Sequence, residues 1–415
     1  MANPLRKPQI WVMAALGFAS GLPLALTALT LRQWLSESGT TLAAIGFTAN
    51  IGLAYTLKFA WAPVLDQVRP PLLGRRRGWL VVIQVLLVIA CISFAWSDPN
   101  VAPLALIGSA VAIAFLSASQ DVVVDAWRIE MFPGDDLRGV ALAAYIWGYR
   151  AALLVGGAGA IRLVNDLGWH GSLSVMAALI ACSLIATLCA SEPVPSAAVV
   201  ALTLRVRLRL SVVEPFREFL QRPGAAPILA FVMSFKLGEA LAHTMAVPFY
   251  NAMGFDRTQI AFATGVPGLA ASLAGAAAGG WLIARIGIGR SLIMTGFVQM
   301  ASMSLYFALA VSGGDWRILV AKIVLENVAE GMADAAFISY LSSLCAVAFT
   351  ATQYALLSSL AAVGLRTLGG FSGVLAGALG WVPFYALTIM AAAPAMLIMV
   401  WLLRRFPVRP LEAIP

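Results

Sequence analysis

Long apolar runs, separated by short polar or basic stretches, dominate the pattern of this 415-residue chain. A helix that crosses the hydrocarbon core of a bilayer needs about 20 mostly apolar residues. The runs predict spans at 10–31, 44–63, 78–96, 103–128, 139–163, 172–190, 227–250, 260–284, 291–311, 316–343, 352–377 and 381–403. They lack the short alternating strands of an outer-membrane barrel. The chain is therefore predicted to be an all-α integral membrane protein with twelve transmembrane helices.

The spans fall into two sets of six, which is the layout of a transporter built from two six-helix halves. We expect an N-terminal bundle at 1–190, a cytoplasmic basic linker at 191–226 and a C-terminal bundle at 227–415. Within the linker, residues 201–220 mix apolar residues with arginines, which predicts a basic amphipathic segment at the membrane surface. A plain connection and a lipid-sensing or regulatory segment both fit this pattern.

Composition and charge support a membrane protein and orient it. Hydrophobic residues make up 61% of the chain and charged residues 11%, whereas soluble domains have about 25% charged residues. Of the 27 basic residues, eighteen fall on the side of the N-terminus, four on the opposite side and five within spans. Because cytoplasmic loops retain Lys and Arg, both termini are predicted to be cytoplasmic. The net charge of +8 suits an anionic inner leaflet and requires no nucleic acid partner.

Enzymatic classes find little support in the sequence. No lysine completes a Gly-x-x-x-x-Gly-Lys loop, so this chain alone is not expected to use ATP. Two histidines, His170 and His243, are too few for the usual zinc site, and we expect neither metal nor cofactor. A membrane hydrolase with a serine nucleophile, or with Asp121 and Asp125 as an acid pair, is the enzymatic alternative.

Charges inside the predicted spans are the main candidates for function. An ionisable side chain at the bilayer centre costs about 2.5–3.5 kcal/mol on insertion scales, so it must pair or face an interior cavity. Eleven such residues occur: Asp121, Asp125, Glu239, Glu326, Glu330, Asp334, Lys58, Arg150, Lys236, Lys322 and Arg366.

Their spacing places most of these charges on single helix faces. Asp121 and Asp125 are four residues apart, so they share a face of the fourth span beside Gln120. Two further stripes are Lys322, Glu326, Glu330 and Asp334 in the tenth span, and Lys236, Glu239 and His243 in the seventh. Structural ion pairing, such as Lys322 with Glu326, is one interpretation. Proton coupling by Asp121, Asp125, Glu326 or Glu330 is the other, because a carboxylate whose proton affinity depends on exposure can couple protons.

The loop between the second and third spans resembles a signature of the major facilitator superfamily. It reads Asp66 to Gly74, followed by Arg75, Arg76 and Arg77. A similar stretch, from Gly279 to Arg290, lies between the eighth and ninth spans. In that superfamily the loop locks the cytoplasmic gate in the outward-open state. Charge that only sets the topology is the alternative reading.

Further stretches resemble the anhydromuropeptide permeases, the AmpG-type transporters of Gram-negative bacteria. They are residues 16–27, 58–66, 74–79, 117–127, 236–239, 326–327 and 349–358. The resemblance implies that this chain is a monomer in the inner membrane. It also implies that the chain imports N-acetylglucosaminyl-anhydro-N-acetylmuramic acid and its peptides, coupled to protons. Such a ligand carries hydroxyl, acetamido and carboxylate groups, so the expected substrate-binding residues are Gln120, Arg150, Lys236, Glu239, Asn327, Gln353 and Arg366.

The chain departs from the family pattern in three spans. Glu330 and Asp334 stand where relatives have small residues, the eighth span lacks a lysine, and Leu365 rather than glycine precedes Arg366. These departures keep two alternatives open for function. One is another carrier of the superfamily, such as the acetyl-coenzyme A branch with its similar Gln-Asp motif; the other is a non-transporting membrane sensor or lipid enzyme.

Overall fold

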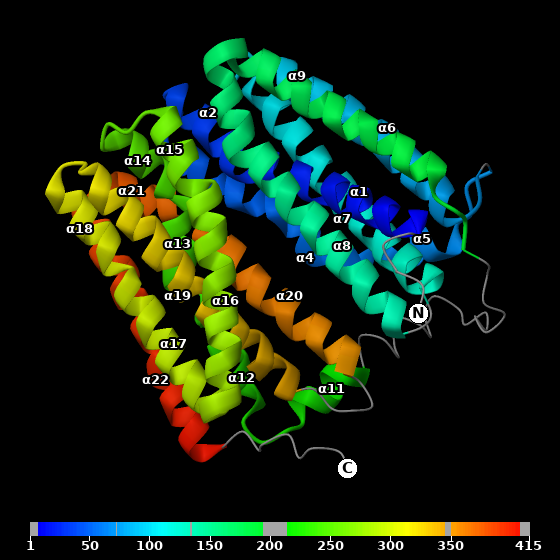
Figure 1. Cartoon of the computed structure of the whole chain (residues 1–415). Coiled ribbons are helices and arrows are strands. Elements are labelled where there is room, and N and C mark those ends of the chain that lie inside the picture. The colour runs from blue at the N-terminus through cyan, green and yellow to red at the C-terminus, as the bar shows by residue number, and fades with distance from the viewer. Residues whose placement is uncertain (1–6, 72, 133–134, 194–213, 345–349, 407–415) are drawn as a thin grey trace. The chain divides into compact units, whose positions relative to one another are not determined.

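A computed structural model of the chain describes residues 7–71, 73–132, 135–193, 214–344 and 350–406. Every regular element within these ranges is a helix, which confirms the all-α prediction (Figure 1). The chain divides into two compact units: unit 1 is Met1–Thr40 with Ile51–Ala201, and unit 2 is Thr41–Asn50 with Leu202–Pro415. The domain boundaries at 190 and 226 stay a prediction, because residues 194–213 of the linker lie outside the described ranges.

The described part of unit 1 contains five long helices, with short helices and turns between them. Its elements are α1 (Pro8–Ala25), η2 (Leu26–Thr30), α2 (Leu31–Glu37), α4 (Leu53–Leu57), η4 (Lys58–Ala60), α5 (Ala62–Gln67), α6 (Arg76–Trp96), α7 (Pro103–Met131), α8 (Asp135–Leu154), η5 (Val155–Gly159) and α9 (Ala160–Cys189). The 3₁₀ turn η3 (Thr48–Gly52) begins in unit 2 and ends in unit 1.

Glycines let α1 and α8 approach each other closely. A Cβ atom on Gly148 of α8 would lie 1.9 Å from the carbonyl oxygen of Ala14 in α1. The two π turns, η2 and η5, also meet, because the Thr30 hydroxyl donates a hydrogen bond of 2.6 Å to the carbonyl oxygen of Gly156. Small residues at such positions are typical of helix contacts within membranes.

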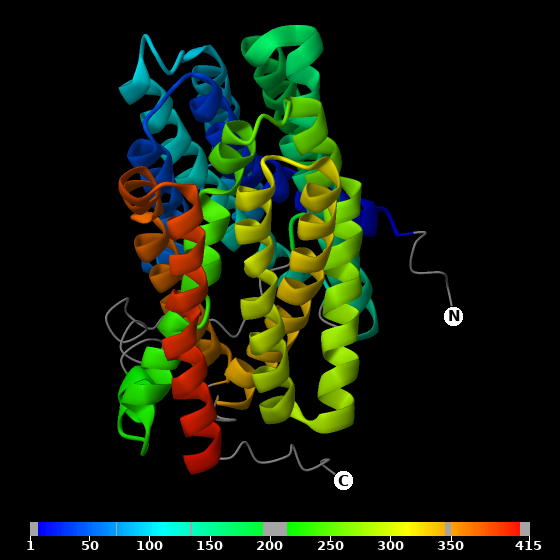
Figure 2. The same cartoon turned by 90° about the vertical axis from the view of Figure 1, so that its left-hand side faces the viewer.

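Within the described residues, unit 2 combines four helices of 20 or more residues with shorter helices that join into spans. Its elements are α3 (Leu42–Phe47), α11 (Glu214–Leu220), α12 (Ala225–Ser234), α13 (Leu237–Thr244), α14 (Ala246–Ala252), α15 (Arg257–Thr264), α16 (Val266–Ile286), α17 (Ile288–Ser302), α18 (Ser304–Ser312), α19 (Trp316–Ser343), α20 (Thr350–Gly369), α21 (Ser372–Leu379) and α22 (Trp381–Arg405). Figure 2 shows the same helices from a second direction.

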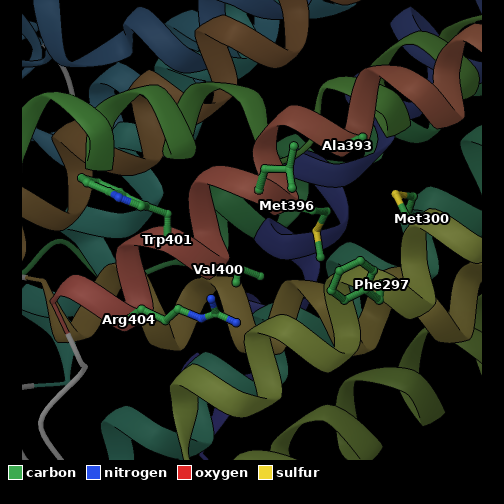
Figure 3. Close-up of a pocket in the computed structure, with 8 residues that line it drawn as sticks. Phe297, Met300, Ala393, Met396, Val400, Trp401 and Arg404 are labelled. Carbon is green, nitrogen blue, oxygen red and sulfur yellow. The ribbon is translucent and has the colours of Figure 1, made fainter.

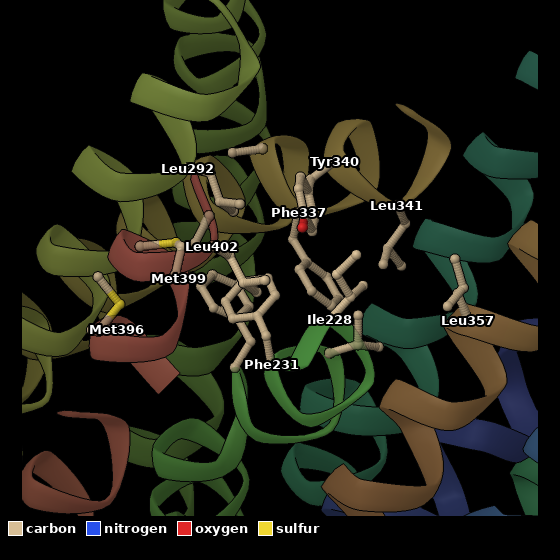
Figure 4. Packing of buried hydrophobic residues seen from close by; sticks show 14 of the residues in the cluster. Ile228, Phe231, Leu292, Phe337, Tyr340, Leu341, Leu357, Met396, Met399 and Leu402 are labelled. Atoms are coloured by element: carbon tan, nitrogen blue, oxygen red, sulfur yellow. The ribbon is translucent and has the colours of Figure 1, made fainter. Parts of the chain in front are cut away.

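Buried apolar side chains form a cluster at one end of unit 2. Phe231 of α12 packs with Phe337 and Tyr340 of α19, while Met399 of α22 belongs to the same buried cluster (Figure 4). The stacked rings of Phe235 and Phe337, 4.8 Å apart, extend the cluster along α19. This packing ties helices together at the end where α17 begins and α22 ends.

The helices are consistent with twelve spans. Among the described residues, nine stretches are long and apolar enough to cross a membrane. One of them, Ala144–Cys189, is interrupted at Gly168, where the backbone is not helical (φ 69°, ψ 176°). The Ser172 hydroxyl donates to the carbonyl oxygen of Ala160, so the chain folds back there and the stretch holds two spans. The other two expected spans correspond to the charge-bearing α19 and the shorter apolar segment Leu42–Leu57.

Several spans that read as continuous apolar runs are broken helices. The seventh is interrupted between Ser234 and Leu237, with Lys236 as the residue preceding α13. In the fifth span of the first half, the glycine pair after Arg150 lies in η5; in the second half, the pair after Arg366 ends α20. Backbone breaks near the bilayer midplane form binding sites in many transporters.

Candidate functional site

Both acids of the Gln-Asp motif have basic neighbours in unit 1. The ammonium nitrogen of Lys58 in η4 lies 4.0 Å from a carboxylate oxygen of Asp121 in α7. Asp125, one turn further along α7, pairs with Arg128 at 3.0 Å. The Asp121 side chain is 13% exposed and that of Asp125 46%, so the two carboxylates of one face differ in their access to solvent.

Gln120 lies in the interface between α7 and α1. Its side chain is buried, and its amide nitrogen lies 3.5 Å from the Ser20 hydroxyl. The side-chain oxygen of Gln120 and one carboxylate oxygen of Asp121 are buried and accept no hydrogen bond from the residues described. Two neighbouring acceptor atoms are therefore available to a donor that these side chains do not supply.

The predicted gating loop is held by a carboxylate that caps a helix. Glu192 accepts backbone N–H groups of Arg75, Arg76 and Arg77 at 2.6–2.9 Å, at the start of α6. Gly74 makes this possible, because its φ is +85° and a Cβ there would lie 2.5 Å from the Glu192 carboxyl carbon. Anions are stabilised at helix N-termini by these unpaired N–H groups.

The arginine side chains of the loop bind the ends of two other helices. Arg75 and Arg76 both donate to Glu130 near the end of α7, at 2.9 and 2.6 Å. Arg77 donates to the carbonyl oxygen of Leu188 near the end of α9, at 2.7 Å. The loop thus joins α6, α7 and α9 inside unit 1. Asp66 ends up in α5, and its side chain lies outside the described residues.

A cluster with more acids than bases surrounds the break in the seventh span. Lys236 pairs with Glu239 at 3.2 Å and with Asp334 of α19. The other Glu239 oxygen accepts a hydrogen bond from the side chain of Gln299 in α17. Glu330, one turn before Asp334, acts electrostatically on both Lys236 and Glu239. One ammonium group therefore faces three carboxylates, a set that we call the acidic cluster.

Lys322 is buried in an aromatic pocket of unit 2. Its ammonium group lies 2.5 Å from Glu326 and donates to the Tyr250 hydroxyl at 2.6 Å. It also lies 3.3 Å from the centroid of the Tyr306 ring. The Lys322 side chain is 1% exposed and that of Glu326 10%. The ion pair expected from the spacing of these two residues is present, and cation–π contacts add to it.

The remaining predicted substrate residues are more dispersed. Arg150 is half-buried in α8 and Arg366 in α20, each close to the backbone irregularity of its span. The Asn327 side-chain amide donates to the carbonyl oxygen of Ile323 within α19. Gln353 lies in α20, but its side chain falls outside the described residues. Substrate contacts of these residues stay a prediction.

Comparisons with known proteins then assign the family. The family model of the Major Facilitator Superfamily matches residues 10–301. An anhydromuropeptide permease of Escherichia coli (strain K12) is 38% identical over 396 residues, which cover 95% of this chain and 79% of that protein. The chain belongs to the anhydromuropeptide permease family of this superfamily. A putative transporter AmpG 4 of Rickettsia felis is 34% identical to this chain, and the match covers 93% of this chain and 94% of the Rickettsia protein.

Solved structures agree with this family member at the level of the fold. A mutant of the nucleoside transporter NupG superposes with a TM-score of 0.72 at 16% identity, over 96% of this chain and 99% of its own. A D-xylose-proton symporter superposes with a TM-score of 0.72 at 12% identity, over 97% and 98% of the two chains. The predicted superfamily fold is confirmed, and the chain is a multi-pass membrane protein.

The sequence analysis did not predict several hydrogen-bond and ion-pair partners of the candidate site residues of this permease-family chain. Glu130 and Glu192 hold the gating loop, although Glu192 lies 115–117 residues beyond the arginines that it contacts. Gln299 and Tyr250 contact Glu239 and Lys322 from other helices. A search for acidic residues near the ends of the predicted helices would have identified Glu130 and Glu192 as candidates. No pattern in the sequence points to Gln299 or Tyr250.

Proposed function

We propose that this chain is a secondary active transporter that imports anhydromuropeptides from the periplasm for peptidoglycan recycling. The observation that carries the proposal is the 38% identity, across 95% of the chain, to a protein named as an anhydromuropeptide permease. We place the transporter in the bacterial inner membrane as a monomer, with both termini in the cytoplasm. The proposed mechanism is alternating access, in which the two halves expose a site first to one side and then to the other.

The substrate chemistry matches polar groups in both units. A muropeptide offers amide and hydroxyl donors, which suit the buried acceptor atoms of Gln120 and Asp121. Its carboxylates could pair with Arg150 and Arg366, which are basic residues within two mainly apolar spans. Because Lys236 is already paired with two carboxylates, we assign it to the acidic cluster rather than to the first contact with an anionic ligand.

Proton coupling is proposed at the carboxylates within the spans: Asp121, Asp125, Glu326 and Glu330. Three carboxylates around Lys236 repel one another, so a proton on Glu330 reduces the excess negative charge of the acidic cluster. Asp121 has a distant partner in Lys58 and a buried oxygen that accepts no hydrogen bond from the described residues. Asp125 and Glu326 are more closely paired with their bases, which favours Asp121 and Glu330 as the groups that exchange protons.

The loop from Gly74 to Arg77 is proposed to act as a gating element. Its backbone and side chains bind Glu192 and Glu130, so the loop connects the ends of three helices within unit 1. A change in the tilt of α6 relative to α7 would break the short Arg76–Glu130 contact. We therefore expect this network to stabilise one conformation of the transport cycle over another.

Counterflow in proteoliposomes tests the substrate class without any ion gradient. Vesicles loaded with unlabelled N-acetylglucosaminyl-anhydro-N-acetylmuramic acid should take up the labelled compound transiently, whereas vesicles loaded with acetyl-coenzyme A should not. Counterflow with acetyl-coenzyme A but not with the anhydro-disaccharide would instead assign the chain to the acetyl-coenzyme A branch of the superfamily. No counterflow with either ligand, by protein that is monodisperse and thermally stable, would contradict the muropeptide proposal.

A further inference from the structure

An apolar groove runs along unit 2 between α17 and α22, and it has a volume of about 520 Å³. Phe297 and Met300 line it from α17, while Met396, Val400 and Trp401 line it from α22 (Figure 3). Among the described residues that line the groove, Arg404 is the one that carries a charge. The groove thus combines an apolar length with a single cationic end.

The two helices are antiparallel, and glycines set their distance. A Cβ on Gly296 would lie 2.9 Å from the end of the Met396 side chain, and one on Gly289 would lie 3.5 Å from Leu403. Seven residues forward along α17 therefore match seven residues backward along α22. This register places Arg404 level with the first turn of α17.

Positive charge gathers at this end of the groove. Arg404 has no acidic partner among the residues described, and its register places Arg290 of α17 within about a turn of it. The unpaired N–H groups at the start of α17 add a partial positive charge. Basic pockets between transmembrane helices, near the cytoplasmic ends of the helices, bind anionic lipid headgroups.

The dimensions and exposure of the groove fit one acyl chain. From Ala393 to Arg404, α22 rises about 16 Å, which is close to half of the roughly 30 Å hydrocarbon core. Leu397 and Trp401, at its rim, are 71% and 52% exposed. In a membrane-spanning helix such apolar surface contacts lipid, so the groove opens toward the bilayer rather than toward water.

We infer that the groove between α17 and α22 binds one anionic phospholipid of the bilayer leaflet at the Arg404 end, with an acyl chain along Phe297 and Val400 and the phosphate group at Arg404. This site is independent of the substrate and coupling residues. It depends on the charge of Arg404 and on the free volume beside Val400.

Native mass spectrometry of the delipidated full-length protein, titrated with phosphatidylglycerol or with phosphatidylcholine of the same acyl chains, tests this site. The wild type should retain one phosphatidylglycerol more tightly than phosphatidylcholine. Arg404→Gln should weaken phosphatidylglycerol about fivefold, the factor that corresponds to ~1 kcal/mol per basic residue near a headgroup. Arg405→Gln is the matched control, because this neighbour carries the same charge but does not line the groove.

A second pair of variants tests the apolar part. Val400→Trp fills the groove and should weaken both lipids, whereas Met390→Trp, on an exposed position of α22 outside the lining, should leave both unchanged. Equal binding by wild type and Arg404→Gln, an equal loss in Arg405→Gln, or unchanged binding in Val400→Trp would each overturn the proposal. Displacement of phosphatidylglycerol by millimolar inorganic phosphate would show a simple anion site instead of a lipid site.

Discussion

At the scale of single residues, charges inside the predicted spans pair both within their own helix and with groups from other helices. Helical periodicity was sufficient to predict that Lys322 and Glu326 share a face. It was not sufficient to predict that Tyr250 and Tyr306 enclose the ammonium group, because these contacts join residues 16 or more positions apart. Long-range partners of this kind depend on how the helices pack, which the pattern of one chain does not specify.

The buried pair in unit 2 gives a stability prediction. Lys322→Met leaves the Glu326 carboxylate without its cation, and removal of one partner of a buried ion pair costs about 3–5 kcal/mol. We expect a markedly lower thermal unfolding midpoint in detergent. The double variant Lys322→Met/Glu326→Gln should recover most of the loss, since no buried charge remains unpaired. A double variant as unstable as the single one would show that the ammonium–aromatic contacts, rather than the charge pairing, stabilise this site.

The helix cap of the gating loop gives a second prediction. Glu192→Ala removes the acceptor of three backbone N–H groups at the start of α6 and should reduce stability by about 1–2 kcal/mol. The matched control is Asp166→Ala, which breaks an exposed pair with Arg162 and should change stability by less than about 0.5 kcal/mol. Thermal unfolding of both variants measures the difference. Equal midpoints would mean that the cap contributes nothing beyond a surface ion pair.

At the scale of elements, apolar runs predicted where the helices lie but not where they break. The interruption at Lys236 and the π turns at η2 and η5 occur inside runs that look continuous. Such breaks arise because neighbouring helices supply new hydrogen-bond partners, as Thr30 does for Gly156. The basic segment predicted at 201–220 falls mainly outside the described residues, and α11 covers its end.

Helix packing in unit 1 can be tested with two glycines. Gly148→Ala places a Cβ against the Ala14 carbonyl oxygen, so α1 and α8 must separate, and we expect lower stability and less folded protein. Gly108→Ala, in α7 with no atom within 4 Å of its Cβ position, should be neutral or slightly stabilising. Size-exclusion chromatography and thermal unfolding report both effects. Similar behaviour of the two variants would mean that the α1–α8 contact is looser than the structure indicates.

At the scale of the whole molecule, fold and family follow from sequence, whereas site roles do not. The count and charge of the apolar runs predicted a multi-pass transporter, and the quoted motifs predicted the family that the comparisons assign. The roles of Asp121 and Glu330 depend on proton movement during a cycle, which neither a motif nor one conformation reports. Measurements of coupling must therefore assign them.

Asp121→Asn separates coupling from transport. The amide preserves the size of the side chain but cannot release a proton, so we expect loss of gradient-driven accumulation with counterflow retained. In the wild type, uptake should increase as the external pH is lowered from about 7.5 to 5.5, while in the variant it should be flat. Glu330→Gln is tested in parallel. If Asp121→Asn still accumulates substrate uphill, Asp121 is not the coupling residue.

The most direct test is uptake of labelled N-acetylglucosaminyl-anhydro-N-acetylmuramic acid, with and without its peptide, into proteoliposomes that hold the full chain. An imposed inward proton gradient is compared with the same vesicles after the gradient is collapsed by a protonophore. We predict accumulation above the external concentration only while the gradient lasts. Equal uptake under both conditions would contradict proton coupling, and no uptake by folded protein would contradict muropeptide import.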